Sequence, residues 1–339
     1  MNELKELLFR LCAAPGTPGD EHAAAQIVAE ELSQYGEASI DSMGNVIAKL
    51  GKKGAKEHIM LDAHIDQIGL IVTGIDDAGF LHIDRSGGVD RRVLPGSPVL
   101  VYGREVLHGI VCCTPPHLSD GSEDKVEPID KLSVDVGLSK EEAEHLIQPG
   151  DRILLYAEPK ALLGSRVSAA ALDDRAGVTA LIRCVQLLAD TDLNCELTVV
   201  CSSREEVGGQ GAMTGTYSVN PTRAIAVDVS FAAQPDVPPE KCGKLGGGPM
   251  IGIAPALDRI MSDRFVELAK AAGMPYKLDV MGGSTGTNCD EISVTRKGVP
   301  SALISIPLRY MHTQVEVIDL NDVENVAKLM ADYIKEVQA

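Results

Sequence analysis

Residues 165–177 read Ser-Arg-Val-Ser-Ala-Ala-Ala-Leu-Asp-Asp-Arg-Ala-Gly, a run of small residues followed by two adjacent carboxylates. Asp173 and Asp174 precede an apolar pattern that predicts a helix from Ala176 into Leu188. Aspartate is favoured at helix starts, because its carboxylate accepts bonds from free backbone amides and lies at the positive end of the helix dipole. Capping accounts for one of the two carboxylates and poorly for the other. The pair is therefore a candidate for metal binding or catalysis if other carboxylates and histidines converge on it.

Strand and helix patterns alternate on both sides of this stretch. Short apolar runs bounded by turn residues predict strands, and apolar residues at spacings of three and four predict helices. Alternating strands and helices are typical of a mostly parallel sheet with helices on both faces. The predicted helices are 2–13, 20–34, 174–190, 258–272, 289–297 and 321–336, and the predicted strands are 38–41, 45–49, 58–63, 195–201, 224–227 and 302–306.

Residues 69–163 have a different sequence pattern, in which short segments of alternating apolar and polar residues are separated by turns that contain Gly, Pro and Asp. This spacing is typical of a small all-β barrel or sandwich. Within it, the polar and acidic stretch 115–130 is predicted to be a mobile loop. We therefore expect an α/β fold with a mostly parallel sheet sandwiched by helices and an inserted small β-barrel. The catalytic α/β domain would comprise residues 1–68 and 164–339, and the insertion residues 69–163.

The composition disfavours several classes of partner. The 339 residues include 49 acidic and 31 basic ones, a net charge of -18, whereas nucleic acids and anionic membranes bind clustered Lys and Arg. None of the eight cysteines belongs to a Cys-x-x-Cys pair, so we expect reduced and mostly buried thiols. No apolar run reaches the roughly 18 residues of a membrane span, and the first residues form an amphipathic helix pattern rather than a signal peptide. We expect a cytoplasmic protein that binds neither nucleic acid nor membrane.

Histidines and carboxylates follow several of the predicted strands, where ligand-binding residues collect in open α/β sheets. They are His64 and Asp66 after strand 58–63, Glu205 and Glu206 after strand 195–201, Asp228 after strand 224–227 and His312 after strand 302–306. Mixed His and carboxylate ligands suit Zn, Mn or Co better than Ca or Mg. Five ligands with one bridging carboxylate would give each of two ions three protein ligands and leave positions open for water and substrate.

These residues also have ordinary structural interpretations. His64 suits a half-buried site, and Asp66 could cap a turn or orient His64. Adjacent glutamates such as Glu205 and Glu206 are commonly solvated, although here they follow an apolar strand and precede Val-Gly-Gly. Asp228 ends a buried strand, where an unpaired carboxylate is costly. The interpretation as a metal site depends on their convergence.

Six short motifs run in order along essentially the whole chain. They are His64-x-Asp66-x-Ile-Gly69, Ala171-Leu-Asp-Asp-Arg-x-Gly177, Glu205-Glu-Val-Gly208, Val227-Asp-Val229, Gly246-Gly-Gly-Pro249 and Arg309-Tyr-Met-His-Thr313 with Glu316. In this combination the chain resembles the M42 family of metallo-aminopeptidases, the tetrahedral or deblocking aminopeptidase group. The resemblance implies a di-metal exopeptidase with two divalent ions (Zn, Co or Mn) per subunit, which removes N-terminal residues from short peptides.

The resemblance also implies a role for each matching residue. Five would be metal ligands: Asp173 as the bridge, His64 and Asp228 completing one site, Glu206 and His312 the other. Glu205 would be the general base that takes a proton from the metal-bridging water, and Asp66 would orient His64. Family members hold the peptide bond after the bridging aspartate in cis. They also use the β insertion to form homo-oligomers, either dodecamers or dimers.

Four positions depart from the family pattern, namely Gln67, Gly209, Gln210 and Asn288. Asn288 stands where some relatives have Asp near the bound substrate, so we expect a shifted specificity for the N-terminal residue. The alternatives are a related di-metal amidase, deacylase or carboxypeptidase, and a non-catalytic metal-binding assembly protein. Glu205 favours an enzyme, because a scaffold has no reason to keep a general base.

Overall fold

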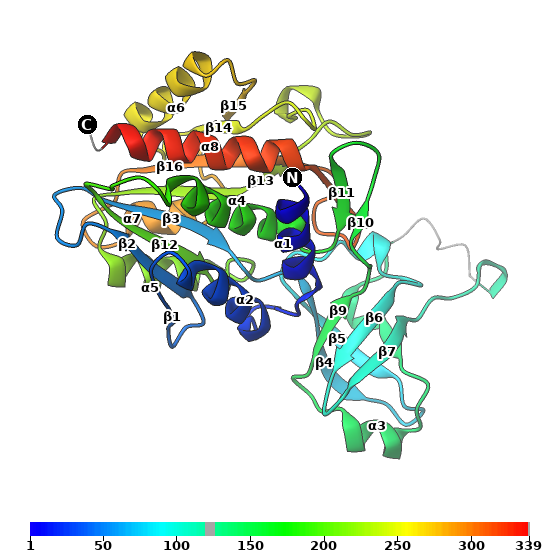
Figure 1. Cartoon of the computed structure of the whole chain (residues 1–339). Helices are drawn as coiled ribbons and strands as arrows, with labels where there is room; N and C mark the ends of the chain where they lie inside the picture. Colours follow the sequence, from blue (N-terminus) through cyan, green and yellow to red (C-terminus); the bar gives the residue numbers. More distant parts are fainter. Residues whose placement is uncertain (119–125, 338–339) are drawn as a thin grey trace.

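The computed structural model describes residues 1–118 and 126–337. Figure 1 shows an α/β body with a β barrel beside it. The predicted mobile loop 115–130 falls partly on residues 119–125, which lie outside the described residues. Its described flanks contain two short 3-10 helices, η2 (Pro116–Leu118) and η3 (Ile129–Lys131).

An eight-stranded sheet forms the centre of the α/β body. In spatial order its strands are β1 (Glu37–Ile40), β2 (Val46–Gly51), β12 (Glu196–Ser202), β3 (His58–His64), β13 (Arg223–Phe231), β16 (Ser301–Leu308), β14 (Met250–Ile253) and β15 (Lys277–Val280). The four strands β12, β3, β13 and β16 run parallel to one another. β14 and β15 at one edge are also parallel to each other, so most strand pairs are parallel as predicted, whereas β1 with β2, β2 with β12 and β14 with β16 form antiparallel pairs. The sheet is therefore mixed.

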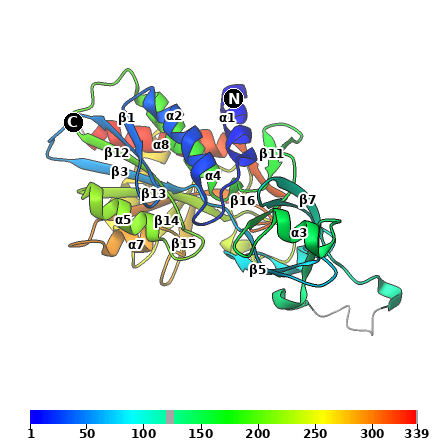
Figure 2. The same cartoon turned by 90° about the horizontal axis from the view of Figure 1, so that it is seen from below.

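Helices cover both faces of the sheet, as Figure 2 shows from below. One face carries α1 (Asn2–Ala13), α2 (His22–Ser33), α4 (Leu172–Leu188), α6 (Arg259–Ala271) and α8 (Leu320–Val337), and the other carries α5 (Gln210–Val219) and α7 (Cys289–Val294). Successive strand residues point to opposite faces, so Ile59 and Leu61 join the larger core with α4 while Met60 joins the smaller core with α5. The described helices include none that is long and apolar enough to cross a membrane.

The chain leaves the sheet after β3 and builds a closed six-stranded barrel. Its strands are β4 (Gly69–Ile75), β5 (Leu81–Ser86), β6 (Pro98–Tyr102), β7 (Val106–Val111), β8 (Ser133–Asp135) and β9 (Arg152–Leu155), with the helix α3 (Lys140–Leu146) before β9. Alternate residues such as Leu70 and Val72, or Val99 and Val101, point inward and form a core separate from that of the α/β body. The α/β fold with a small inserted barrel agrees with the expectation from the sequence.

A small third sheet lies where the chain passes from the barrel back to the α/β body, before α4. It contains β10 (Lys160–Ala161), β11 (Arg166–Ala169) and β17 (Glu316–Asp319). β17 pairs antiparallel with β11, so that Glu316 lies opposite Ala169, just before α4 begins. These strands, like β14 and β15, are too short to give a clear alternating pattern, and the sequence did not predict them.

Candidate metal centre

The carboxyl ends of the parallel strands meet at one edge of the central sheet. β3 ends at His64, which pairs with Ser202 at the end of β12. On β13, Asp228 pairs with Ser305 of β16. The start of α4 and the segment after β16 reach the same edge. The predicted ligands that they carry therefore lie close to those from the strands. The predicted residues therefore converge, although they come from five separate segments.

The first group of potential ligands consists of His64, Asp173 and Asp228, all of which are buried. One ligand atom from each lies within 4.8 Å of the others, and His64 Nε2 is 3.1 Å from Asp173 Oδ1. The other ring nitrogen of His64, Nδ1, lies 3.1 Å from the backbone oxygen of Asp66. An Nδ1–H donated to this carbonyl leaves the Nε2 lone pair directed into the cluster, as metal binding requires.

The second group consists of Asp173, Glu206 and His312, and it meets the same 4.8 Å criterion. His312 Nε2 lies 3.4 Å from Asp173 Oδ2 and 3.5 Å from Glu206 Oε1. His312 Nδ1 lies 2.8 Å from the backbone oxygen of Gly88, so Nε2 is again free to face the cluster. Asp173 thus belongs to both groups, with one carboxylate oxygen near each histidine.

The two adjacent aspartates at the start of α4 differ in what their carboxylates contact, which the sequence left open. The carboxylate of Asp174 accepts a hydrogen bond from the amide of Gly177, 3.0 Å away, in the first turn of the helix. The carboxylate of Asp173 instead faces the two histidines. The peptide bond between them is cis, as the family resemblance implied. Capping therefore falls to Asp174, which leaves Asp173 available for metal ions.

Burial makes this cluster electrostatically unfavourable without bound cations. Burial raises the pKa of Asp228 well above its usual value and that of Glu206 to about 8, and the charge of Asp173 adds to both shifts. The two histidines are the only described residues that form ion pairs with the ligand carboxylates. Two divalent cations would balance the carboxylates, and mixed imidazole and carboxylate donors suit Zn, Co or Mn. The residues present therefore fit the metal pair.

In Asp173 and His64, by contrast, the pKa shifts favour the charged form of the side chain. Burial opposes the charge of Asp173, but hydrogen bonds from His312 and His64 outweigh it and hold the pKa of Asp173 below its usual value. Burial likewise opposes the charge of His64, yet the hydrogen bonds with Asp173 and Asp66 raise its pKa well above the ordinary range. Metal ions would compete with protons for the same ring nitrogens.

Asp66 holds the segment that carries the two glutamates. Its carboxylate oxygens accept hydrogen bonds from the backbone amides of Glu205 and Glu206, at 3.0 and 3.1 Å. Asp66 Oδ1 also lies 3.4 Å from His64 Nδ1. The sequence predicted the relation to His64 but not the contact with the two amides, which depends on how the loop after β12 folds. Asp66 is fully buried, so this contact is shielded from water.

Glu205 lies at the wall of a cavity of about 800 Å³ that the potential metal ligands also line. Burial raises the pKa of its carboxyl above the ordinary value, and the negative charge of Asp173 adds to the shift. His64, Asp173, Glu206, Asp228 and His312 line the same cavity. A carboxylate with a raised pKa beside a cluster of metal ligands is well placed to take up and release a proton.

Glu316 is a site residue whose role the sequence did not assign. It is a fully buried carboxylate at the start of β17. Its side chain accepts hydrogen bonds from the backbone amides of Asp173 and His312. The signal in the sequence was its place in the Arg-Tyr-Met-His motif, which gave no indication of the partner.

The four residues that depart from the family pattern do not line the cavity. Asn288 is buried, and its Nδ2 donates to Asp62 Oδ2 at 2.9 Å and to Ser202 Oγ at 2.7 Å. Thr285 and Thr287 from the same segment reach the cavity instead. Asn288 therefore does not line the cavity, and its position does not favour the shifted specificity for the N-terminal residue that we expected from the sequence. The other three are Gln67, which is buried, and Gly209 and Gln210 at the start of α5.

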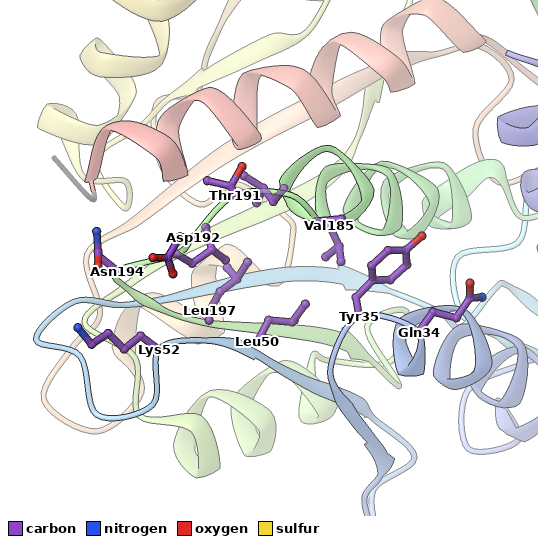
Figure 3. Close-up of a pocket in the computed structure, with 13 residues that line it drawn as sticks. Gln34, Tyr35, Leu50, Lys52, Val185, Thr191, Asp192, Asn194 and Leu197 are labelled. Atoms are coloured by element: carbon purple, nitrogen blue, oxygen red, sulfur yellow. The ribbon is translucent and has the colours of Figure 1, made fainter.

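A second cavity of about 710 Å³ lies far along α4 from Asp173, around the end of this helix (Figure 3). Tyr35, Leu50 and Val185 are among its apolar residues, and Lys52 and Asp192 are its charged residues. None of the predicted site residues lines it. The predicted site residues that line a cavity are those of the cavity at the potential metal ligands.

Comparisons with known proteins identify the family of the chain. Residues 44–329 match the M42 glutamyl aminopeptidase family. The chain is 34% identical to the lysyl aminopeptidase of Pyrococcus furiosus, over 98% of this chain and 97% of the relative.

Solved structures give the same result. An aminopeptidase from Desulfurococcus kamchatkensis superimposes with a TM-score of 0.92 at 33% identity, covering 99% of this chain and 95% of the other. The TET1 peptidase of Pyrococcus horikoshii, described as assembling into a tetrahedron or a large octahedral shell, has a TM-score of 0.86 at 32% identity, covering 98% and 99%. By its sequence and its fold, the chain belongs to the M42 aminopeptidase family and is a peptide hydrolase.

Proposed function

We propose that this protein is a two-metal aminopeptidase that removes N-terminal residues from short peptides. The observation that carries the proposal is the position of Asp173, because one of its carboxylate oxygens faces His64 and the other faces His312. A carboxylate in that position is suited to bridge two cations. Zn, Co and Mn are the candidate metals, because all three accept imidazole and carboxylate ligands.

Each group of ligands would hold one ion. His64 and Asp228 would complete one site with Asp173, and Glu206 and His312 the other. When bound, two such ions polarise a peptide carbonyl and lower the pKa of a water molecule, which makes it a nucleophile at neutral pH. Asp66 keeps Glu205 and Glu206 in place through their backbone amides.

Glu205 would be the general base. Its raised pKa gives it a substantial affinity for a proton, so it can accept one from the attacking water and pass it to the amine that leaves. Because the carboxyl lies at the cavity wall, the substrate peptide can reach it. The alternative activities, a deacylase, an amidase or a carboxypeptidase, would use the same proton transfer and differ in which end of the substrate is held.

The test compares free-amine dipeptides with N-blocked analogues, using chelated protein that is reloaded with Zn, Co or Mn. We expect cleavage of free-amine substrates only, with activity restored by metal. Glu205→Gln should lower kcat roughly 10²- to 10⁴-fold, the usual range for loss of a general base. Glu37→Gln, an exposed residue of β1, is the matched control.

Cleavage of blocked substrates would favour the deacylase. Absence of turnover with every metal, despite two bound ions per chain, would favour the non-catalytic assembly protein. Full activity of Glu205→Gln would remove this residue from the mechanism.

We also propose that the insertion 69–163 forms homo-oligomer contacts, in a dodecamer or a dimer. Support comes from the assembling TET1 relative and from Val106 and Ile110 on β7, which are 54% and 56% exposed. Mass photometry of the wild type and of Ile110→Glu tests this, since a buried charge would weaken the contact.

All eight cysteines are free, which supports a reducing compartment such as the cytoplasm.

A further inference from the structure

The cavity at the metal ligands extends along β13 away from Asp228. Ser230 follows Asp228 by two positions and so lies on the same side of the strand, roughly 6.6 Å further along. Both residues line the cavity. At Ser230 the cavity meets β15, where Ser230 Oγ donates a hydrogen bond to Asp279 Oδ2 at 2.7 Å. This spacing of roughly 6.6 Å along β13 corresponds to the length of one long amino-acid side chain.

Asp279 is a carboxylate that has no cationic partner within residues 1–118 and 126–337. Ser230 is its one hydrogen-bond donor among the described residues, and no described Lys or Arg forms an ion pair with it. The nearest lysine in sequence, Lys277, is engaged elsewhere, since its Nζ donates to the backbone oxygens of Glu240 (2.9 Å) and Cys242. The charge of Asp279 is therefore available to a ligand.

Apolar side chains form part of the wall of the cavity that contains the potential metal ligands and Asp279. Met281 and Leu303 contribute to this wall, and Leu303 lies on the same side of the sheet as Asp228, because Ser305, two residues further along β16, pairs with Asp228. An apolar wall that leads to an unpaired carboxylate suits a long basic side chain, because its methylene groups cover apolar surface while its charged end binds the carboxylate.

We propose that Asp279 determines the side-chain specificity of the enzyme and selects peptides that begin with Lys or Arg. The inference rests on the proposed aminopeptidase function, since the metal centre holds the peptide bond that is cleaved. The side chain of the first residue extends along β13 past Ser230, and its cationic group pairs with Asp279. Ser230 fixes the carboxylate in this position.

Lys241 provides the competing interpretation, a preference for acidic residues. It lines the same cavity, but it lies on the exposed 3-10 helix η4 (Pro239–Lys241) directly beside Glu240, which carries the opposite charge. The two charges offset each other at the rim. Asp279 is only partly exposed and is oriented by a hydrogen bond, so its charge acts at closer range and with less screening.

The experiment measures kcat/KM of metal-loaded protein for lysyl, leucyl and glutamyl p-nitroanilides. We expect the wild type to prefer lysyl over glutamyl substrate at least tenfold. Asp279→Asn keeps the size and the bond to Ser230 but removes the charge, and it should lower the ratio of lysyl to leucyl cleavage about tenfold, as expected for loss of a charged hydrogen bond. Asp279→Glu keeps the charge and should retain most of that ratio.

Two further variants separate local from general effects. Asp190→Asn removes the same charge at the exposed end of α4, remote from the cavity, and should leave the ratio at its wild-type value. Lys241→Gln tests the competing interpretation and should not lower glutamyl cleavage relative to leucyl.

If the ratio of lysyl to leucyl cleavage were the same in the wild type and in Asp279→Asn, the assignment of Asp279 would be overturned. The proposed aminopeptidase function would not be affected. A wild-type preference for glutamyl substrate that disappears in Lys241→Gln would overturn it in favour of Lys241. Failure of the wild type to cleave any of the three substrates would count against the proposed function itself.

Discussion

The carboxylate of Glu316 accepts a hydrogen bond from the backbone amide of Asp173, with 3.2 Å between Oε2 and N, although 143 residues separate them in the chain. Its other oxygen, Oε1, accepts from the amide of His312 at 2.9 Å. One buried side chain thereby joins the segment of the proposed bridging ligand to the segment of a terminal ligand. We infer that Glu316 sets the spacing of the two segments to which the metal ions would bind.

Glu316→Gln should weaken metal binding. Glutamine can accept only one of the two amide hydrogens and places its own NH₂ group against the other, so one segment loses its anchor. Residues that support metal ligands typically contribute 10- to 100-fold in affinity, and we expect a loss on the order of 10-fold or more. Competition with a fluorescent chelator measures it, with Glu37→Gln as the control. Wild-type affinity in the variant would show that the ligand segments hold their positions without Glu316.

Asp66→Asn should lower kcat more than metal affinity. The amide side chain can accept from Glu205 or from Glu206 but not from both, so the general base loses its fixed position. The backbone oxygen that faces His64 Nδ1 is unchanged, which preserves the orientation of this ligand. We expect kcat to fall on the order of 10- to 100-fold, measured together with the metal content of the same preparation. A fall in activity that merely follows a fall in metal content would contradict this account.

Asn288→Asp should reduce stability and leave substrate preference unchanged. The substitution places a second carboxylate against Asp62 in a buried environment, where the Asn288 amide now donates. Losing that donor and adding an unpaired charge costs about 3 kcal/mol, which lowers the melting temperature by several degrees. Differential scanning fluorimetry and the three-substrate panel measure both quantities. A changed preference with unaltered stability would instead support contact between Asn288 and the substrate.

The stability of the Gly246–Gly248 loop should depend on pH through Asp322. Burial raises the pKa of Asp322 to about 7, although the amides of Gly246 and Gly248 donate to its carboxylate and partly offset this effect. In the unfolded chain the same group titrates near 3.9. Between these two values the folded state binds more protons than the unfolded state, so the contribution of Asp322 to stability falls as pH rises from about 4 to about 7.

Asp322→Asn removes this titration. The melting temperatures of wild type and variant are measured in steps from pH 5 to pH 8. As the pH rises, the melting temperature of the variant should increase relative to that of the wild type. The baseline loss from replacing one hydrogen-bond acceptor is the same at every pH and does not affect the comparison. Two parallel curves would contradict the raised pKa of Asp322.

The chain's local patterns determined most of the α/β body. Helical spacing in segments such as 2–13 and 321–336 and the apolar runs of β3 and β12 depend only on neighbours in the sequence, and the structure has α1, α8 and both strands at these places. The end of the predicted helix 289–297 was wrong by three residues, because Thr295 is extended and Arg296 has a positive φ of 56°. The polar residues after each strand could be identified for the same local reason.

Contacts between distant segments were decided by the tertiary structure alone. The sequence identified Asp66 and Glu316 as motif residues, but their amide partners depend on the fold of the loop after β12 and on the pairing of β17 with β11. The bond between Ser230 and Asp279 likewise requires β15 to reach the end of β13. Such relationships leave no periodic pattern, because neither segment carries information about the position of the other. A sequence can state which side chains are available for chemistry, whereas strand pairing and loop closure decide which of them meet.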